Sequence, residues 1–435
     1  MMYFSLNREA PNVSFKEAVI KGLAPDRGLY FPSEINKLPQ SFFDNIQNLD
    51  NNEIAFEVIK QFVGEAIPEK DLKLIIEDVL NFDFPLINVE ENISALELYH
   101  GPTMAFKDVG ARFMARCLGY FNKDNKNKEE VTVLVATSGD TGGAVASGFL
   151  GVEGVEVVIL YPSGKVSDIQ EKQLTTLGEN IIALEVDGTF DDCQDMVKQA
   201  FLDEDYLGKR KLTSANSINI ARWLPQMFYF FFAYKTLKTN NKKLVFSVPS
   251  GNYGNICAGM MAQKLGLPIH HFVTGTNANN VVPEYLKTGK YNTKRSVQTI
   301  SNAMDVGAPS NFIRIQELHN NDLETLKSNL SGYSYTDTET TNAVKSLYVN
   351  NNYIADPHGA IGYLALKDYL KKDLNSYGVF LETAHPIKFL DVMPKQIVKQ
   401  IAIPKQIEAV INRKKQSLST STYSDLKTFL LKDFN

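Results

Sequence analysis

The sequence predicts an α/β fold of open, mostly parallel sheets flanked by helices. Two observations lead to this prediction. From about Val131 onward, short β-branched runs alternate with helical patterns, and Gly-rich turns follow several of those runs. Such alternation is typical of a parallel sheet covered by helices on both faces. Because ligands of open sheets bind at the carboxyl ends of the strands, we expect the chemistry in the loops that follow them.

The expected elements can be placed in order along the chain. We expect strands over 131–136, 155–161, 181–186, 243–248, 269–274 and 377–381. Helices are expected over 142–149, 168–177 and 191–202. The apolar run Met227–Ala233 is far shorter than the roughly 20 residues needed to cross a bilayer. It therefore predicts a buried helix.

Residues 1–85 have a different pattern. They contain helical stretches and turn signals such as Pro25–Gly28, without alternation of strands and helices. The helical stretches cover 15–21, 50–63 and 70–80. We therefore expect a separate, mainly helical N-terminal domain.

Composition excludes several classes of protein. The net charge of −5 argues against a nucleic-acid binder, which usually has a basic face. The mixed-sign run 123–130 predicts a solvated loop. Cys117, Cys193 and Cys257 lie too far apart for a disulfide framework or a zinc site. The first residues lack the basic and apolar regions of a signal peptide. We expect a cytoplasmic protein without nucleic-acid or membrane partners.

Lys107 is the first candidate for a reactive side chain. It lies between the turn at Gly101-Pro102 and an expected apolar helix that begins at Asp108. Burial would lower its pKa, and a less protonated amine can condense with an aldehyde. The alternative is a structural lysine paired with Asp108 or another carboxylate. This segment alone does not decide between the two.

Two strand-end loops are suited to anions. Thr137–Gly143 offers hydroxyls and backbone N–H groups at a helix start, although it could also be a simple helix cap. Pro249–Asn255 places two glycines among small polar residues, so that consecutive N–H groups can converge on a phosphate. No Walker lysine follows, which favours a monophosphate ester. A tight turn without a ligand is the alternative.

Two further segments carry weaker signals. Arg222 follows Asn216 near an expected helix start and could clamp a carboxylate or phosphate, or pair on the surface. Leu381–Pro386 ends the last expected strand and indicates little by itself. The histidines show no metal-binding spacing, so we expect no metal site. A lysine that can bind an aldehyde, together with two anion-binding loops, suits pyridoxal 5'-phosphate.

These motifs and their order resemble the threonine synthases, in the tryptophan-synthase-β-like group (fold type II) of pyridoxal-phosphate enzymes. Val13–Val19 and Gly28–Pro32 are similar to that family's N-terminal domain. His100–Asp108 is similar to its lysine segment, and Asn302–Asn311 to another of its signatures. The loops Thr137–Gly143 and Gly251–Asn255 match as well, so the resemblance covers most of the chain.

The resemblance implies a domain arrangement. It implies a threonine synthase N-terminal domain over 1–85 and a pyridoxal-phosphate-dependent catalytic region over 86–435. A smaller α/β subdomain of about 100–215 would be inserted within the larger one. A helical tail would cover about 395–435.

The resemblance also implies roles for residues. Lys107 would form the Schiff base and move protons, and Thr383 would hydrogen-bond the pyridine nitrogen. Related enzymes often have Asn where this chain has Asp140, the expected partner of the ring's 3-hydroxyl. The remaining roles fall into three groups: Gly251, Asn252, Tyr253, Gly254 and Asn255 for the cofactor phosphate, Ser138 and Thr141 for the substrate carboxylate, and Asn216 and Arg222 for the substrate phosphate.

The implied activity is a lyase reaction on a small molecule. O-phospho-L-homoserine and water would give L-threonine and phosphate by β,γ-elimination and hydration, the last step of threonine biosynthesis. Two alternatives remain: a threonine or serine dehydratase-like lyase, and a catalytically silent relative that binds its ligand only. The sequence leaves open whether the protein is a monomer or a homodimer.

Overall fold

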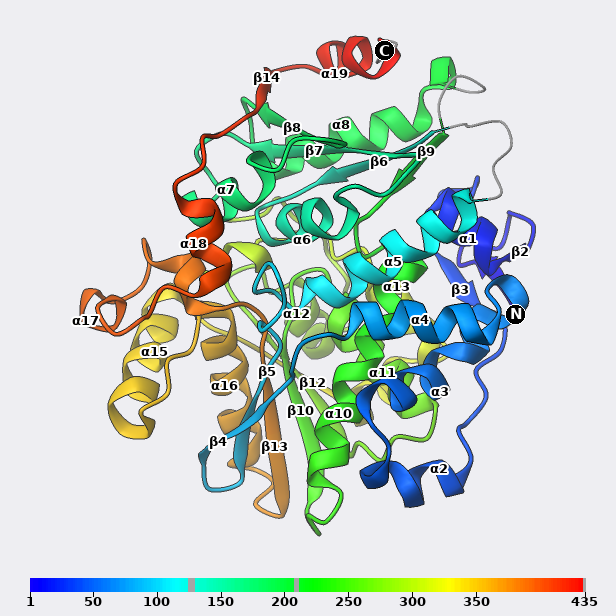
Figure 1. Ribbon diagram of the computed structural model, residues 1–435. Helices are drawn as coiled ribbons and strands as arrows, with labels where there is room; N and C mark the ends of the chain where they lie inside the picture. Colours follow the sequence, from blue (N-terminus) through cyan, green and yellow to red (C-terminus); the bar gives the residue numbers. More distant parts are fainter. Residues whose placement is uncertain (124–129, 207–210, 433–435) are drawn as a thin grey trace.

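The chain forms two open sheets with helices packed around them and a small third sheet near the N-terminus (Figure 1). The computed structural model describes residues 1–123, 130–206 and 211–432. The solvated loop expected over 123–130 lies almost wholly outside these residues. Within the described ranges, no helix combines the length and apolar character that crossing a membrane requires.

The smaller of the two open sheets lies at the top of Figure 1 and is parallel throughout, in the order β14-β8-β7-β6-β9, where β14 is Leu418–Thr420. Strands β6 and β7 are buried along their whole length, as expected for β-branched runs covered on both faces. Its elements are β6 (Val131–Ala136), α6 (Asp140–Phe149), β7 (Val155–Pro162), α7 (Asp168–Thr175), β8 (Ile181–Val186), α8 (Phe190–Leu202), η3 (Glu204–Tyr206) and β9 (Lys211–Ser214).

The larger sheet has the order β12-β11-β10-β13-β5-β4 and is parallel except for the edge strand β4. Its strands are β4 (Leu86–Glu90), β5 (Ile93–Glu97), β10 (Lys243–Pro249), β11 (His271–Thr276), β12 (Leu330–Ser334) and β13 (Ser376–Glu382). Helix α5 (Lys107–Asn122) packs against α6 of the smaller sheet and against α9 (Ile220–Trp223). The helices of the larger sheet are α9, η4 (Leu224–Met227), α10 (Phe228–Leu237), α11 (Gly254–Lys264), α12 (Val281–Thr288), η5 (Asn302–Met304), α13 (Phe312–Leu318), α14 (Leu323–Asn329), α15 (Asp337–Asn351), α16 (Pro357–Leu370) and η6 (Pro386–Phe389).

The C-terminal segment joins the two parts. Figure 1 shows it running in orange and red from α17 and α18 up to β14 and α19 at the smaller sheet. It contains α17 (Lys395–Val398), α18 (Lys405–Ile411), β14 (Leu418–Thr420) and α19 (Tyr423–Leu431). The segment is thus not helical alone, since β14 pairs in parallel with β8.

The N-terminal segment contains three short strands in addition to the expected helices. Its elements are β1 (Met2–Ser5), β2 (Val13–Ser14), α1 (Phe15–Lys21), β3 (Tyr30–Pro32), α2 (Gln40–Asn45), η1 (Ile46–Asn48), α3 (Asn51–Val63), η2 (Gly64–Ala66) and α4 (Glu69–Val79). Strands of two to four residues, paired antiparallel, are too short to produce a recognisable alternation in the sequence.

Buried contacts attach the N-terminal segment to the part of the chain that forms the two open sheets. The Phe31 ring of β3 lies 5.8 Å from the Trp223 ring of α9, measured between centroids. The buried Arg314 guanidinium lies 4.3 Å from the Trp223 ring centroid and donates to the Tyr30 carbonyl at 3.0 Å. One apolar core runs from α1 and α3 through α5 and α10 to α11. The N-terminal segment therefore shares its core with the region that carries Lys107.

The packing of Phe31 against Trp223 predicts that a substitution in the N-terminal segment lowers the stability of the shared core. Replacing the buried Phe31 by alanine should lower the free energy of unfolding by roughly 3–5 kcal/mol, because a cavity opens against Trp223. Trp223 is the only tryptophan, so its fluorescence during urea unfolding reports directly on this interface. Leu74→Ala is the control, since Leu74 is 56% exposed and should change stability by less than about 0.5 kcal/mol. Equal stabilities of the two variants would contradict the shared core.

Candidate active site

An antiparallel bridge sets the position of Lys107. The residues before α5 pair with those after β13 through the bridge Ala105–Ala384. Phe106 N–H donates to the Thr383 carbonyl at 2.8 Å, and His385 N–H donates to the Met104 carbonyl at 3.1 Å. The lysine segment and the last strand end, which are far apart in the sequence, therefore meet at one place.

Lys107 is the first residue of α5, and its side chain is half-buried. Within the described part of the chain, its amine has no hydrogen-bond acceptor and no carboxylate within 4.0 Å. Burial lowers the pKa of Lys107 to about 8. The charge of Asp140 opposes this shift, whereas the charges of Lys388 and Arg222 add to it. An amine with this pKa is unprotonated in a minor fraction at neutral pH and mostly so above pH 8, a far larger share than for an ordinary lysine, and that fraction can condense with an aldehyde.

Asp108 pairs with Thr103 and not with Lys107. Its carboxylate accepts from Thr103 N–H at 2.9 Å and from the Thr103 hydroxyl. A Cβ added to Gly101 would lie 2.5 Å from Asp108 Oδ2, so the turn passes close over this carboxylate. The structural alternative for Lys107 is therefore not realised: Asp108 holds the preceding turn in place.

The loop after β10 presents a run of free backbone donors. Among the described residues, no acceptor lies within hydrogen-bond distance of the N–H groups of Gly251–Asn255. Tyr253 has a left-handed backbone (φ 63°), which turns successive N–H groups toward one side before α11 begins at Gly254. A Cβ added to Gly251 would lie 2.7 Å from Met304 Cα, so only glycine fits against the signature segment 302–311.

The side chains of this loop hold its shape. Asn252 Oδ1 accepts from Ser310 N–H at 2.5 Å, and Asn255 Nδ2 donates to the Pro249 carbonyl at 2.8 Å. Tyr253 is buried, and its hydroxyl accepts from Thr274 at 3.2 Å. The backbone N–H groups are thus free for an anion, while the side chains fasten the loop to its surroundings.

The loop after β6 contains a buried ion pair. Asp140 Oδ1 lies 2.6 Å from Lys388 Nζ and accepts from Gln170 Nε2 at 2.8 Å. Burial alone would raise the pKa of Asp140, but the charges of Lys388 and Lys107 outweigh it and hold that pKa well below the usual range. Ser138 and Thr141 on the same loop are half-buried. Their hydroxyl groups have no partner within the described ranges.

The other predicted residues occupy the walls around this centre. Thr383 is buried, and no described group lies within hydrogen-bond distance of its hydroxyl. Asn216 donates to the Ala136 carbonyl at 3.0 Å, which ties the end of β9 to the end of β6. Arg222 is buried, with Nη1 2.5 Å from the Ala215 carbonyl, and burial lowers its pKa to about 10. The structure brings Lys107, Asp140 and Arg222 within electrostatic range of one another.

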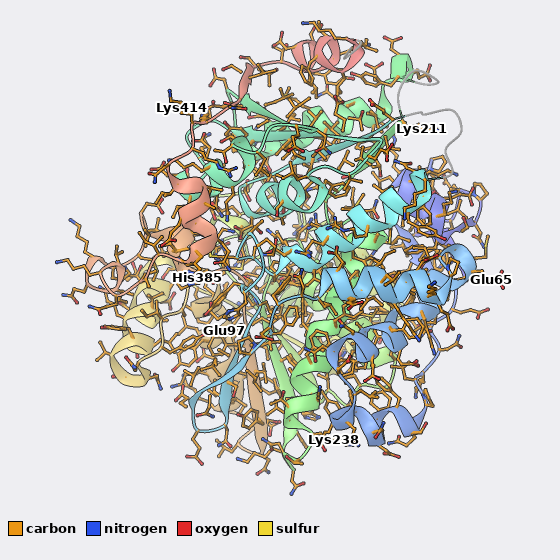
Figure 2. All side chains as sticks on the ribbon, in the orientation of Figure 1. Glu65, Glu97, Lys211, Lys238, His385 and Lys414 are labelled. Carbon is orange, nitrogen blue, oxygen red and sulfur yellow. The ribbon has the colours of Figure 1, made fainter. Side chains whose placement is uncertain are left out.

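Several side chains at this centre were not among the predicted site residues. The buried Lys388 lies in η6, two residues after the segment Leu381–Pro386, and the buried Tyr229 of α10 donates to the Phe106 carbonyl. Glu97 and His385, labelled in Figure 2, lie where β5 and β13 end, with Tyr99 5.1 Å from His385 between ring centroids. A lysine among apolar residues (Ile387, Phe389, Leu390) was the available signal for Lys388.

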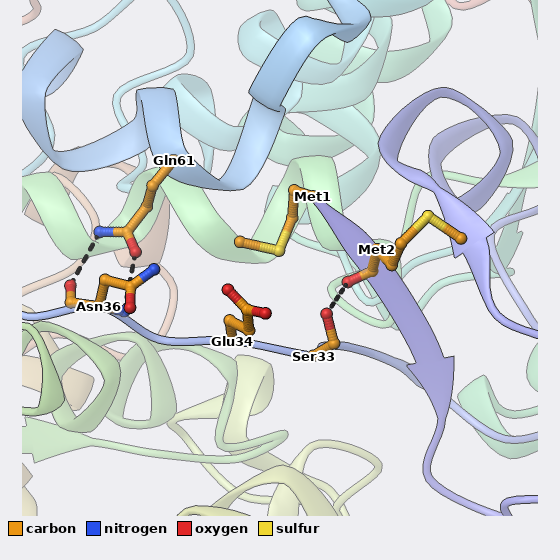
Figure 3. A pocket seen from close by; sticks show the side chains of 6 residues that line it. All are labelled: Met1, Met2, Ser33, Glu34, Asn36 and Gln61. Carbon is orange, nitrogen blue, oxygen red and sulfur yellow. Dashed lines mark hydrogen bonds between the residues drawn. The ribbon is translucent and has the colours of Figure 1, made fainter.

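Two cavities lie apart from these residues. The one in Figure 3 has a volume of about 340 Å³ and is lined by Met1, Met2, Ser33, Glu34, Asn36 and Gln61. A second, of about 640 Å³, is lined by residues between Pro39 and Glu77. Both belong to the N-terminal segment and include none of the predicted site residues.

Comparisons with known proteins agree with this geometry. Residues 85–381 match the family model described as pyridoxal-phosphate dependent enzyme, and residues 2–80 match that of the threonine synthase N terminus. Threonine synthase of Buchnera aphidicola subsp. Acyrthosiphon pisum is 42% identical over 434 residues, covering 99% of this chain and 100% of the relative.

The chain belongs to the threonine synthase family.

Solved structures support the same assignment. Threonine synthase from Escherichia coli superposes with a TM-score of 0.92 at 39% identity, covering 99% of both chains. The pyridoxal-phosphate-bound threonine synthase from Brucella melitensis has a TM-score of 0.89 at 33% identity, covering 99% of this chain and 98% of that one. These findings confirm the predicted fold, family and cofactor. The protein is a pyridoxal-phosphate-dependent lyase that acts on a small molecule.

The residues present suit this cofactor. Its phosphate needs several donors, and five consecutive N–H groups are free in the loop 251–255. Its aldehyde needs an unpaired amine, which Lys107 provides. Its ring nitrogen and ring hydroxyl need polar partners, and Thr383 and Asp140 Oδ2 both lack one among the described atoms. The site therefore fits the family's cofactor.

The environment of Lys107 predicts a pH dependence for its amine in the cofactor-free full-length chain. Below pH 8 the amine is protonated and unreactive, so its acetylation rate with acetic anhydride should rise through about pH 8 and then level off. Mass spectrometry of the Lys107 peptide gives this rate. Lys371 serves as an internal control, because its hydrogen bond to Asp368 raises its pKa above the usual value. A midpoint for Lys107 as high as that of Lys371 would contradict the described environment.

Proposed function

We propose that these residues carry out the conversion of O-phospho-L-homoserine and water to L-threonine and phosphate, with the roles implied by the family resemblance. The observation that carries this proposal is the unpaired, pKa-lowered amine of Lys107 beside the free hydroxyl of Thr383 and the ion-paired Asp140. Bound pyridoxal phosphate supplies an electron sink for the negative charge that develops on the substrate carbons.

The cofactor would be held at three places. Lys107 would bond to its aldehyde, and Gly251, Asn252, Tyr253, Gly254 and Asn255 would donate backbone N–H groups to its phosphate. Thr383 would hydrogen-bond the ring nitrogen. Asp140 would accept from the ring hydroxyl through Oδ2, since Oδ1 is already engaged by Lys388 and Gln170.

The substrate would lie between the two sheets. The Ser138 and Thr141 hydroxyls, with the N–H groups at the start of α6, would bind its carboxylate. Asn216 and Arg222 would bind its phosphate. Support for Arg222 comes from its unpartnered Nε and from the absence of a salt bridge to any described carboxylate. A buried guanidinium without a counterion suits a phosphate dianion.

Lys107 would move the protons of the reaction. Its amine would remove the proton from Cα, assist loss of the proton from Cβ, and return a proton to Cα at the end. The Cγ–O bond to phosphate breaks, and the proton that the Lys107 amine took from Cβ then bonds to Cγ to form the methyl group. A water oxygen bonds to Cβ to form the hydroxyl of threonine, and the second proton of that water goes to the released phosphate. A pKa of about 8 allows one amine both to accept and to donate protons near neutral pH.

The domain boundaries and cellular setting complete the proposal. Residues 1–85 would form the N-terminal domain and 86–435 the catalytic region, with the smaller subdomain over about 100–215 and a tail over about 395–435. The family matches over 2–80 and 85–381 support a boundary near 85. The enzyme would act in the cytoplasm, without nucleic-acid partners.

Product analysis tests the reaction. The wild-type enzyme should release phosphate from O-phosphohomoserine, and Lys107→Ala should lower kcat by at least about 10³-fold, because it removes both the covalent bond and the proton carrier. Lys198→Ala, on the exposed face of α8, should keep wild-type turnover. Ammonia release from threonine without phosphate release would favour the dehydratase alternative. Cofactor binding without either product would favour a silent binding protein.

The phosphate loop predicts an effect on cofactor affinity. Gly251→Ala should weaken pyridoxal-phosphate binding at least about tenfold, or about 1.4 kcal/mol, because the new Cβ must displace the backbone at Met304. Titration of the cofactor-free chain, followed by cofactor absorbance, gives the Kd. Gly119→Ala in α5 is the matched control, since its Cβ would meet only a Val152 methyl at 3.3 Å. Unchanged affinity in Gly251→Ala would place the cofactor phosphate elsewhere.

A further inference from the structure

Lys388 is a fully buried lysine at the junction of the two sheets. Its side chain is 0% exposed and that of Asp140 is 3% exposed. Lys388 Nζ lies 2.6 Å from Asp140 Oδ1 and donates to the Thr103 carbonyl at 2.9 Å. It therefore connects η6 of the larger sheet with α6 of the smaller sheet and with the turn that precedes Lys107.

Two glutamines of α7 bind the same two oxygen atoms. Gln170 Nε2 donates to Asp140 Oδ1 at 2.8 Å, and Gln173 Nε2 donates to the Thr103 carbonyl at 3.0 Å. Each acceptor of Lys388 thus receives a second hydrogen bond from a neutral donor. Two donors, Lys388 Nζ and Gln170 Nε2, are directed at Asp140 Oδ1 and hold it in position.

The charges around Lys107 come from several elements. Asp140 on α6 is the anion that acts on it, and Lys388 on η6 and Arg222 on α9 are the cations. Asp108, on the helix of Lys107 itself, interacts with Lys388 and with Arg222. Without Lys388, the buried Asp140 would retain Lys107 as its cationic neighbour. A carboxylate in a dry site favours the protonated form of such an amine.

We propose that Lys388 is a positioning residue which, by pairing with Asp140, keeps that carboxylate from forming an ion pair with Lys107 and leaves the Lys107 amine free to bond to the cofactor. This inference rests on the proposed role of Lys107. In this arrangement Lys388 neutralises the charge of Asp140 through Oδ1. The second carboxylate oxygen, Oδ2, would then face the site without attracting the Lys107 proton strongly.

The charges around Lys107 predict an order for its pKa in four cofactor-free, full-length proteins: the wild type, Lys388→Met, Asp140→Asn and the double variant. Lys388→Met removes a repelling cation and frees Asp140, so the acetylation midpoint of Lys107 should rise by at least about one pH unit. Asp140→Asn removes the attracting carboxylate and keeps the repelling Lys388, so the acetylation midpoint of Lys107 should fall below that of the wild type. The double variant loses both charges and should return toward the wild-type midpoint. Midpoints that do not follow this order would overturn the proposal.

A purely structural role would give a different result. It would lower the unfolding midpoint of Lys388→Met and of the double variant alike, with no ordered change in the Lys107 midpoint. Lys388→Arg keeps the positive charge and should keep the wild-type midpoint. If Lys388→Met does not fold, Lys388→Arg and Asp140→Asn still test the order, and equal midpoints in these two would refute it.

Turnover separates this inference from the proposed function. The kcat of Lys388→Met on O-phosphohomoserine should be at least about 100-fold below that of the wild type. Adding Asp140→Asn to this variant should recover at least about tenfold of that loss. No recovery in the double variant would count against the pair. Because acetylation needs no substrate, the ordered midpoints would stand even if the wild-type enzyme proved inactive on O-phosphohomoserine.

Discussion

The antiparallel bridge between the lysine segment and the residues after β13 fixes the geometry on which the rest of the site depends. Its two hydrogen bonds, from Phe106 to Thr383 and from His385 to Met104, set the register of two segments more than 270 residues apart in the chain. Lys107 follows Phe106 directly, and Lys388 follows His385 after one turn of η6. This pairing of two short segments therefore places the Lys107 amine, the Thr383 hydroxyl and the buried Lys388 ammonium relative to one another.

Within this frame, the site must hold several charges on largely buried side chains. Two buried cations, Lys388 and Arg222, act on Lys107, and a single carboxylate, Asp140, acts in the opposite direction. Since burial penalises every charge, the position of each hydrogen bond decides which group carries a proton. The firm pairing of Asp140 with Lys388 leaves Lys107 as the group that can lose its proton most readily near neutral pH.

The sequence predicted those parts whose signal is local. Strands β6 and β8 were predicted to the residue, because β-branched runs buried on both faces are bounded by clear turns. The strands β4, β5 and β9 were not predicted. Strands β5 and β9 are short and pair with strands from distant segments, and β4 is a partly exposed edge strand that pairs with β5. In the same way, Lys107 could be singled out as a candidate from its own segment, and the two anion-binding loops were needed to favour a reactive role. Lys388 could not, because its role arises only where η6, α6 and α7 meet.

The phosphate loop, residues 251–255, is connected by buried polar contacts to residues well outside the site. Gly251 packs directly against Ala303 and Met304, and Ala303 N–H donates to His358 Nε2 at 3.2 Å. His358 in turn contacts the buried Asp356 through Nδ1 at 2.5 Å, and Asp356 N–H donates to Glu382 at 3.4 Å. Burial and the proximity of Asp356 raise the pKa of Glu382 well above its usual value. Because Glu382 immediately precedes Thr383, the two ends of the proposed cofactor pocket are joined through one buried polar network. A change at His358 should therefore be transmitted to both ends.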